Sequence, residues 1–276
     1  MRLSPDDVAA IRLLAAEVAA KDGAPPLSDE ALIRLTHPDV VHLRVPEHGD
    51  VAGYAQLADG AAEILATDPA TAATLLDHVA EHEPDLSVWA HGGRSPLIAA
   101  AESRGFVKVR TLWQLRRPLS HLPEAEIPHG IDVRPFAVGQ DEQAWLVVNA
   151  AAFASHPEQG RWTMADLVER EAESWFDPAG FLLAWRGDEL LGYHWTKVHR
   201  EEEPALGEVY VLGVGPAAQG LRLGAGLLIA GLRHLAAQGL PTVLLYVDDD
   251  NVAAMRLYEK YGFTRHELDV QYRRSA

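Results

Sequence analysis

Apolar and polar residues follow one another along the chain in a pattern that predicts strands and helices in a repeated order. Leu86–Ala90 and Thr242–Val247 are short apolar runs, which are typical of buried strands. A polar turn and a helical pattern follow each run, and a further strand is then expected over 107–116 and 263–273. The pattern therefore predicts the same strand–helix–strand order in both halves of the chain.

A sequence repeat supports this duplication. Each of the two helices ends at a Gly-Phe step, Gly105-Phe106 and Gly262-Phe263, where glycine supplies the left-handed conformation that ends a helix. The two steps lie 157 positions apart. At the same spacing Glu102 matches Glu259, Gln114 matches Gln271, and Arg116-Arg117 matches Arg273-Arg274.

The second half gives the clearer set of elements, and we predict a mixed α/β fold with helices packed on a central sheet. Strands are expected over 131–136, 181–185, 190–198 and 208–214, and helices over 141–153, 164–175 and 220–237. Ser120–Gly130 holds two prolines and no sustained period, which is typical of a linker. We therefore expect two tandem domains, each with a mixed sheet flanked by helices, over 1–120 and 131–276, joined by a linker over 121–130.

Length and composition fit this picture. The chain has 276 residues, which is about two domains at roughly 150 residues each. A net charge of −16 argues against sequence-independent binding to nucleic acid, which needs a basic face. The absence of cysteine excludes disulfides, thiolate metal ligands and a cysteine nucleophile. Neither a signal-peptide pattern nor a long apolar run is present, so we expect a cytoplasmic protein without a membrane partner.

The stretch 206–226 has the features of an anion-binding loop. It contains an apolar strand, a glycine-rich loop with Arg222, and then an amphipathic helix with Leu227, Leu228, Leu232 and Leu235 on one face. Backbone N–H groups and the helix N-terminus can together hold a pyrophosphate. A tight turn without a ligand is the alternative interpretation. The spacing fits neither the Walker loop nor the dinucleotide fingerprint.

A second pattern follows the last buried strand. Asn251 is expected to cap a helix, and Tyr258 lies seven residues later, about two turns along the same face. A capped amphipathic helix with a packed tyrosine is the alternative interpretation.

Together the two patterns resemble the GNAT acyltransferase superfamily, whose members use acetyl-CoA. The family motif Asn-x-x-Ala-x-x-x-Tyr-x-x-x-Gly-Phe is matched at Asn251, Ala254, Tyr258, Gly262 and Phe263. Its loop motif is matched at Gln219 and Gly224, but Arg222 stands where the first glycine is usual. This departure concerns the path of the loop backbone.

Further strings resemble the mycothiol synthase family of double-GNAT proteins. They are 156–160, 175–178, 192–199, 207–214 and 243–248, with weaker matches at 89–92 and 116–119. The resemblance implies acetyl transfer from acetyl-CoA to the cysteinyl amine of desacetylmycothiol, a cysteine–glucosamine–inositol conjugate, giving mycothiol.

The resemblance also implies two catalytic residues. Glu208 is the candidate base that deprotonates the substrate ammonium, and we expect its strand position to bury it and raise its pKa. Tyr258 is the candidate acid that protonates the departing thiolate of CoA. A solvated glutamate at a strand end is the alternative for Glu208.

Binding residues are implied in the same way. Residues expected to bind acetyl-CoA are Leu212, Gly213, Val214, Gln219, Gly220, Leu221, Arg222, Leu223, Gly224, Ala225, Asn251, Val252, Ala253, Ala254, Met255 and Arg256. Residues expected to contact the acceptor are Asp29, Glu158, Lys197, Glu208 and Tyr246. Ordinary surface charge is the alternative for Glu158 and Lys197, and an ordinary helix start at Ser28–Glu30 is the alternative for Asp29.

The first half has the order of elements but not the chemistry. A helix over 70–81 follows Pro69 directly, with no glycine-rich loop, and Ala101 and Arg94 stand where Tyr258 and Asn251 stand in the second half. We therefore predict a degenerate N-terminal domain that supports the catalytic one and lends Asp29.

Other functions remain as alternatives. His78 and His82 share a helix face, but no metal motif accompanies them, so we expect no metal. No Gly-x-Ser-x-Gly elbow is present for serine hydrolysis. A GNAT enzyme for another amine, such as an aminoglycoside, and a non-catalytic acyl-CoA sensor are the two rivals. We expect a monomer that acts on a small-molecule amine.

Overall fold

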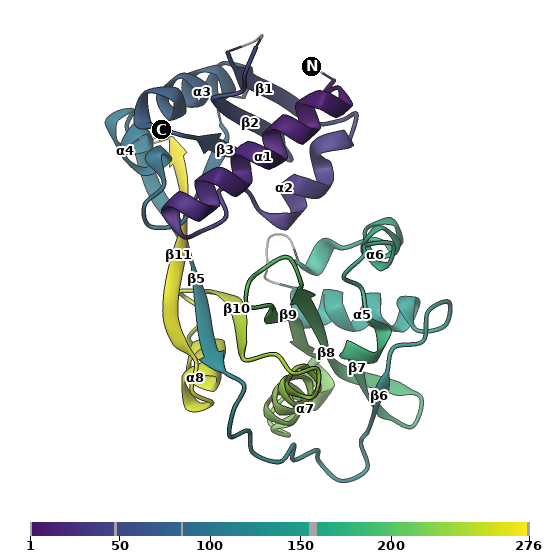
Figure 1. The fold of residues 1–276 in the computed structure, drawn as a ribbon. Coiled ribbons are helices and arrows are strands. Elements are labelled where there is room, and N and C mark those ends of the chain that lie inside the picture. Colours follow the sequence, from purple (N-terminus) through teal and green to yellow (C-terminus); the bar gives the residue numbers. More distant parts are fainter. Residues whose placement is uncertain (1, 47–48, 84, 155–158, 275–276) are drawn as a thin grey trace. The chain divides into compact units, whose positions relative to one another are not determined.

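The computed structural model describes residues 2–46, 49–83, 85–154 and 159–274 (Figure 1). The mixed α/β fold is confirmed. The helices are α1 (Pro5–Asp22), α2 (Asp29–Ile33), α3 (Pro69–His82), α4 (Pro96–Ser103), α5 (Glu142–Ala152), α6 (Met164–Glu171), α7 (Leu223–Ala237) and α8 (Val252–Lys260). The strands are β1 (Val41–Val45), β2 (Gly53–Ala58), β3 (Ala61–Ala66), β4 (Ser87–His91), β5 (Phe106–Pro118), β6 (Asp132–Pro135), β7 (Phe181–Arg186), β8 (Glu189–His199), β9 (Leu206–Val214), β10 (Thr242–Asp248) and β11 (Thr264–Arg274).

Two predicted helices have different bounds from those expected. The helix predicted over 164–175 ends at Glu171, although its start is as predicted, with Thr163 and Asp166 forming a capping box. The helix predicted from 220 begins only at Leu223, because Gly220 and Arg222 both take positive φ angles, +82° and +63°. A left-handed residue cannot continue a right-handed helix. The glycine-rich loop is therefore longer than expected.

Residue contacts divide the chain into two compact units, and each is described by itself. The first contains residues 1–114, 247–252 and 265–276, and the second contains residues 115–246 and 253–264. The last strand, β11, thus lies in the first unit, where it pairs antiparallel with β4 and lies next to β5 (Figure 1).

The strands of the first unit follow one another in the sheet in the order β1-β2-β3-β4-β11-β5, with β3 and β4 parallel. Alternation along β2 and β3 directs their side chains to two cores. Tyr54 and Leu65 pack with α1 and α2, whereas Ala55 and Ile64 pack with α3 and α4. Helices therefore bury both faces of this sheet.

The sheet of the second unit has the order β10-β9-β8-β7-β6, with β9 and β10 parallel. Trp145 on α5 and Trp195 on β8 are fully buried in an aromatic core on one face. On the other face α7 packs through the four leucines predicted to lie inward, all of them fully buried. Gly231 on α7 is required by this packing, because a Cβ there would overlap the ring of buried His194.

Both Gly-Phe steps have the predicted conformation. The φ angles of Gly105 and Gly262 are +75° and +83°, so each glycine ends its helix in the left-handed region. Of the helices in the described part of the chain, none has both the length and the apolar character needed to cross a membrane.

Candidate active site

The candidate base lies at the centre of the second unit's sheet. Glu208 on β9 is the register partner of Lys197 on β8, so the two side chains share one face. The β8–β9 register shifts between Trp195 and Thr196, and Tyr210 is the extra residue of this bulge. Tyr210 therefore also faces Trp195, at 5.3 Å between ring centroids. The bulge brings an acid, a cation and an aromatic ring together.

Glu208 is buried, as predicted, with 5 % of its surface exposed. Its Oε2 lies 2.7 Å from Nε2 of His199, the last residue of β8. The Nδ1 atom of the same ring lies 3.4 Å from Oε1 of Glu201. Exposed side-chain fractions rise along this row, from 7 % for Glu208 to 15 % for His199 and 73 % for Glu201. The carboxylate is thus buried but linked through one imidazole to the surface.

Aromatic rings surround the cation beside Glu208. Lys197 is 4 % exposed, and its Nζ lies 4.8 Å from the ring centroid of Trp175 and 5.7 Å from that of Tyr210. Cation–π contacts of this kind stabilise a buried ammonium group. Lys197 is therefore a buried residue of the site, and the alternative of a surface charge is wrong.

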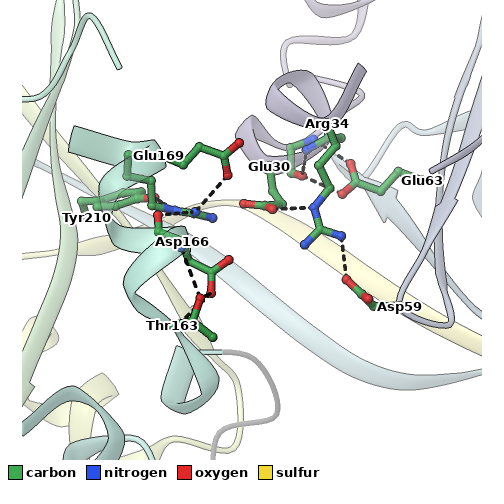
Figure 2. A network of polar contacts seen from close by, with 11 residues as sticks. Glu30, Arg34, Asp59, Glu63, Thr163, Asp166, Glu169 and Tyr210 are labelled. Atoms are coloured by element: carbon green, nitrogen blue, oxygen red, sulfur yellow. Dashed lines mark hydrogen bonds and ion pairs between the residues drawn. The ribbon is translucent and has the colours of Figure 1, made fainter. Parts of the chain in front are cut away.

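A second cation lies on the other side of Tyr210. The Nε of Arg170 on α6 donates to the Tyr210 hydroxyl at 3.3 Å, and its guanidinium lies 4.1 Å from the ring centroid of Trp162. Figure 2 shows Tyr210 beside α6, the helix that also carries Asp166 and Glu169. The hydroxyl of Tyr210 is therefore fixed in place.

The strand β9 separates from β10 immediately after Glu208. Their register consists of Val243 with Gly207 and Leu244 with Glu208, whereas β9 continues to Val214. Backbone groups of β9 beyond Glu208 thus have no register partner in β10 among the described residues. Unpaired strand N–H groups can bind an extended ligand in place of a neighbouring strand.

The three strand residues expected to bind acetyl-CoA lie in this separated part of β9. Leu212 and Val214 are half-buried and Gly213 is buried. Gly213 has a packing reason of its own, because a Cβ there would lie 2.7 Å from the ring of Tyr193.

The loop after β9 presents an exposed, left-handed backbone. Residues 219–222 are exposed, Leu223 is buried, and Gly224 and Ala225 are half-buried. The guanidinium of Arg222 makes no hydrogen bond among the described residues, while its carbonyl accepts from Ala225 N and Gly226 N at the start of α7. Because Arg222 takes φ +63°, the loop keeps a glycine-like path where glycine is absent.

Tyr258 is buried on α8, and its ring packs edge-on against Phe263 at 5.6 Å. Burial raises the pKa of Tyr258 to about 12, so the phenol keeps its proton at neutral pH. The hydrogen bonds of the described residues do not join Tyr258 to Glu208. Asn251–Ala253 and Arg256 are exposed, Ala254 is half-buried and Met255 is buried beside Tyr258.

The remaining predicted acceptor contacts lie elsewhere. Tyr246 is 40 % exposed on β10, two residues beyond Leu244 and so on the face that Glu208 shares. Asp29 is exposed in the first unit as the first residue of α2, whose N-cap is Ser28. The local interpretation as a helix start is therefore confirmed. Glu158 lies outside the described residues.

A separate polar cluster occupies the first unit. His91 on β4 contacts Glu63 through Nε2 at 3.0 Å and Asp269 on β11 through Nδ1 at 3.1 Å. Ser28 donates to Glu63 through its N–H at 2.7 Å and its hydroxyl at 2.6 Å, and Gly92 N donates to Asp269 at 2.9 Å. Figure 2 shows Glu63 in this contact near Arg34. His91, Glu63 and Asp269 thus each have at least two polar partners.

The carboxylates decide the charge of this histidine. Burial by itself would lower the pKa of His91, but the charge of Glu63 and the hydrogen bonds that the ring donates to both carboxylates raise it to about 10. Burial would raise the pKa of Glu63, but the same pairing lowers it. The cluster therefore holds a buried, charged histidine against two carboxyl groups.

Strand register identifies the counterpart of Glu208 in the first unit. Leu244, the partner of Glu208, corresponds to Ser87 at the 157-residue spacing, and Ser87 pairs with Ala61. An alanine thus stands at the position of the candidate base.

Sequence reasoning missed four residues of the site: His199, Trp175, Tyr210 and Arg170. His199 lies two positions beyond Lys197 on one strand, so alternation could have placed it beside Glu208. The bulge that turns Tyr210 inward has no comparable sequence signal. Among the described residues, no group of three His, Asp or Glu side chains has the arrangement of a metal site.

Comparison with known proteins agrees with the geometry. A family model described as Acetyltransferase (GNAT) family matches residues 147–263. A mycothiol acetyltransferase of Geodermatophilus obscurus is 48 % identical over 99 % of this chain and 96 % of its own length. One of Streptomyces coelicolor is 48 % identical over 98 % of this chain and 93 % of its own length.

Solved structures share the fold at lower identity. A GCN5-related N-acetyltransferase of Sphaerobacter thermophilus superposes with a TM-score of 0.70 at 23 % identity, covering 99 % of this chain and 94 % of that one. A tandem GNAT protein from the clavulanic acid biosynthesis pathway gives a TM-score of 0.71 at 17 % identity, covering 99 % and 96 %. The expected tandem GNAT fold is confirmed.

Proposed function

The chain belongs to the mycothiol acetyltransferase family, and from this premise we propose that it transfers the acetyl group of acetyl-CoA to the cysteinyl amine of desacetylmycothiol, giving mycothiol. The observation that carries the proposal is Glu208, a buried carboxylate beside Lys197 at the point where β9 leaves β10. A carboxylate at such a point can receive a proton from an amine that approaches the separated strand.

Glu208 acts as the general base in this proposal. The substrate amine attacks only as the free base, so its ammonium form loses a proton to the Glu208 carboxylate. Lys197 and Tyr246 face the same side as Glu208 and bind the hydroxyl-rich acceptor by hydrogen bonds, with Asp29 and Glu158 as further proposed contacts.

Acetyl-CoA supplies the acetyl thioester. We propose that residues 212–214 bind it through the backbone and that residues 219–225 hold its pyrophosphate, with the guanidinium of Arg222 as a charged donor. Residues 251–256 flank the pantetheine arm. The exposed left-handed loop and the end of β9, which continues beyond its register with β10, support this assignment. Tyr258, still protonated at neutral pH, donates its proton to the departing thiolate.

The first sequence repeat is proposed to be catalytically degenerate. Ala61 stands at the register position of Glu208, and Ala101 at the position of Tyr258. The division into repeats over 1–120 and 131–276, joined by 121–130, is part of this proposal. So is a monomeric cytoplasmic protein that uses no metal and binds neither nucleic acid nor membrane.

A turnover assay tests the proposal. The protein is incubated with acetyl-CoA and either desacetylmycothiol or an aminoglycoside, and the acetylated product is followed by mass spectrometry. We expect product only from desacetylmycothiol. Product only from the aminoglycoside supports the rival GNAT activity, and acetyl-CoA binding without any product supports the sensor.

The matched variants are Glu208→Gln and Glu142→Gln, which each remove one buried carboxylate from the second unit. We expect Glu208→Gln to lower kcat by about 10²–10⁴-fold while acetyl-CoA affinity is kept. Glu142→Gln should keep kcat. Normal turnover by Glu208→Gln would show that Glu208 is not the base.

A further inference from the structure

His199, which lies between Glu208 and Glu201, has no role in the proposed function. His199 ends β8, and its register partner is Leu206, two residues before Glu208 on β9. One ring nitrogen points into the sheet toward Glu208, at 2.7 Å, and the other toward exposed Glu201, at 3.4 Å. The ring therefore spans the boundary between the buried carboxylate and the solvent.

Hydrogen-bond chemistry fixes the direction of the short contact. An ionised carboxylate has acceptor sites only, so at 2.7 Å the Nε2 of His199 must carry the hydrogen and donate it to Oε2 of Glu208. A charge-assisted bond of this length is among the stronger hydrogen bonds in proteins. It fixes the rotation of the carboxyl group and occupies one of its two oxygens.

We infer that His199 is a positioning residue for the base: its Nε2–H holds Oε2 of Glu208, so that Oε1 is the atom that takes the proton from the substrate ammonium. This inference rests on the proposed role of Glu208. In the proton transfer, the ammonium N–H bond breaks and an O–H bond forms at Oε1, while the Nε2–H···Oε2 hydrogen bond stays in place. The nitrogen keeps the electron pair with which it attacks.

The arrangement predicts a shift in pH dependence. In the described part of the chain, the charged and titratable groups on the Glu208 face of the neighbouring strands include His199 and Lys197 from β8 and Tyr246 from β10, with Arg170 beyond Tyr210. A donor to the charged form of a carboxyl group favours that form, so removal of the His199 donor makes the charged form of Glu208, which acts as the base, less favourable. The acid limb of kcat/KM then moves to higher pH.

The test compares His199→Leu with His199→Gln. Leucine removes the donor, whereas glutamine can offer an amide N–H near the place of Nε2. We expect His199→Leu to lower kcat at pH 7 at least about tenfold and to move the acid limb upward by about one pH unit. We expect His199→Gln to stay within about threefold of wild type, and KM for acetyl-CoA to stay within about twofold in both.

His234→Leu is the matched control. His234 lies on α7, on the opposite side of the sheet, and also contacts a carboxylate, Asp177, at 3.4 Å. Its replacement should leave kcat and the pH profile unchanged. An acid limb that does not move in His199→Leu, or His199→Gln as impaired as His199→Leu, would overturn the inference.

A measurement without turnover separates this inference from the proposed function. The ring signals of His199 are titrated by NMR in wild type and in Glu208→Gln. If the pair is coupled, loss of the carboxylate charge lowers the pKa of His199 in the variant. Coupling in a protein that acetylates no amine would reject the proposed function alone. Equal titrations in the two proteins would reject the pairing itself.

Discussion

The two units each place a histidine against carboxylates, and the two histidines differ in what surrounds them. His91 lies between Glu63 and Asp269, both of which also accept hydrogen bonds from backbone or side-chain donors of the first unit. His199 lies between buried Glu208 and Glu201, whose side chain is 73 % exposed. One cluster is closed on all sides, and the other opens to solvent at one end.

This difference bears on the role that we propose for Glu208. In the closed cluster each carboxylate oxygen of Glu63 and Asp269 accepts at least one hydrogen bond, and these contacts join β3, β4 and β11. In the open row, only one oxygen of Glu208 is bound by His199. The same residue types therefore form a closed cluster in the first unit and a row that reaches the surface in the second.

The largest effect is expected from His91→Gln. Removal of one partner from a buried ion pair leaves an uncompensated charge and typically costs about 3–5 kcal/mol of unfolding free energy. Chemical denaturation measures the loss, and His234→Gln, which removes a more exposed contact with Asp177, should cost less than about 1 kcal/mol. Equal losses in the two variants would contradict the structural role of the closed cluster. The folded fraction of His91→Gln should keep its kcat.

The next effect concerns Tyr258, which the first repeat replaces with Ala101. Tyr258→Phe keeps the ring and removes the proton that the thiolate would receive, so kcat should fall by about 10²-fold. Tyr272→Phe is the control, because Tyr272 is also buried but its hydroxyl contacts Glu102 in the first unit. Steady-state kinetics at saturating substrates measure both. Wild-type kcat in Tyr258→Phe would remove Tyr258 from the mechanism.

The pH dependence of the unfolding free energy tests the charge of His91 in the closed cluster and requires no change in the candidate active site. The pKa of His91 is raised to about 10, so its contribution is fully present below its unfolded pKa of about 6.5. It is lost as pH rises from there to about 10, at up to about 1.4 kcal/mol per pH unit. Denaturation at several pH values should show this slope in wild type and a flatter one in His91→Gln. Parallel slopes would show that His91 is not charged by its partners.

Many of the elements that form the two clusters could be predicted from the sequence, for physical reasons that differ between elements. Strands such as β4 and β10 have mainly apolar centres, and Gly105 and Gly262 end their helices as their conformational freedom predicts. Glu208 was placed by its strand and by family resemblance. The contact of Glu208 with His199 was not predicted, because it depends on the register between β8 and β9, and no local sequence pattern fixes that register.

Two other features depended on long-range pairing. Asp269 contacts His91 because β11 pairs with β4. Asp269 also accepts a hydrogen bond from Gly92 N, which lies 177 positions earlier in the chain. The bulge at Tyr210 arises between two long strands and leaves no turn residue in the sequence. Local secondary-structure propensity predicts neither the Asp269–His91 contact nor the bulge, since each depends on which strands become neighbours.

The smallest effect tests the loop that the first repeat lacks. Arg222 holds φ +63°, a conformation that costs a non-glycine residue about 1–2 kcal/mol, whereas glycine there adds about 0.4–1 kcal/mol of unfolded-state entropy. Arg222→Gly should therefore raise the unfolding free energy by no more than about 1 kcal/mol, while Arg222→Ala, which keeps the strain, should not raise it. Both variants lose the charge, so both should raise KM for acetyl-CoA by a similar factor of about five to ten. If only Arg222→Ala raises KM, the backbone path of the loop binds the pyrophosphate and the guanidinium does not.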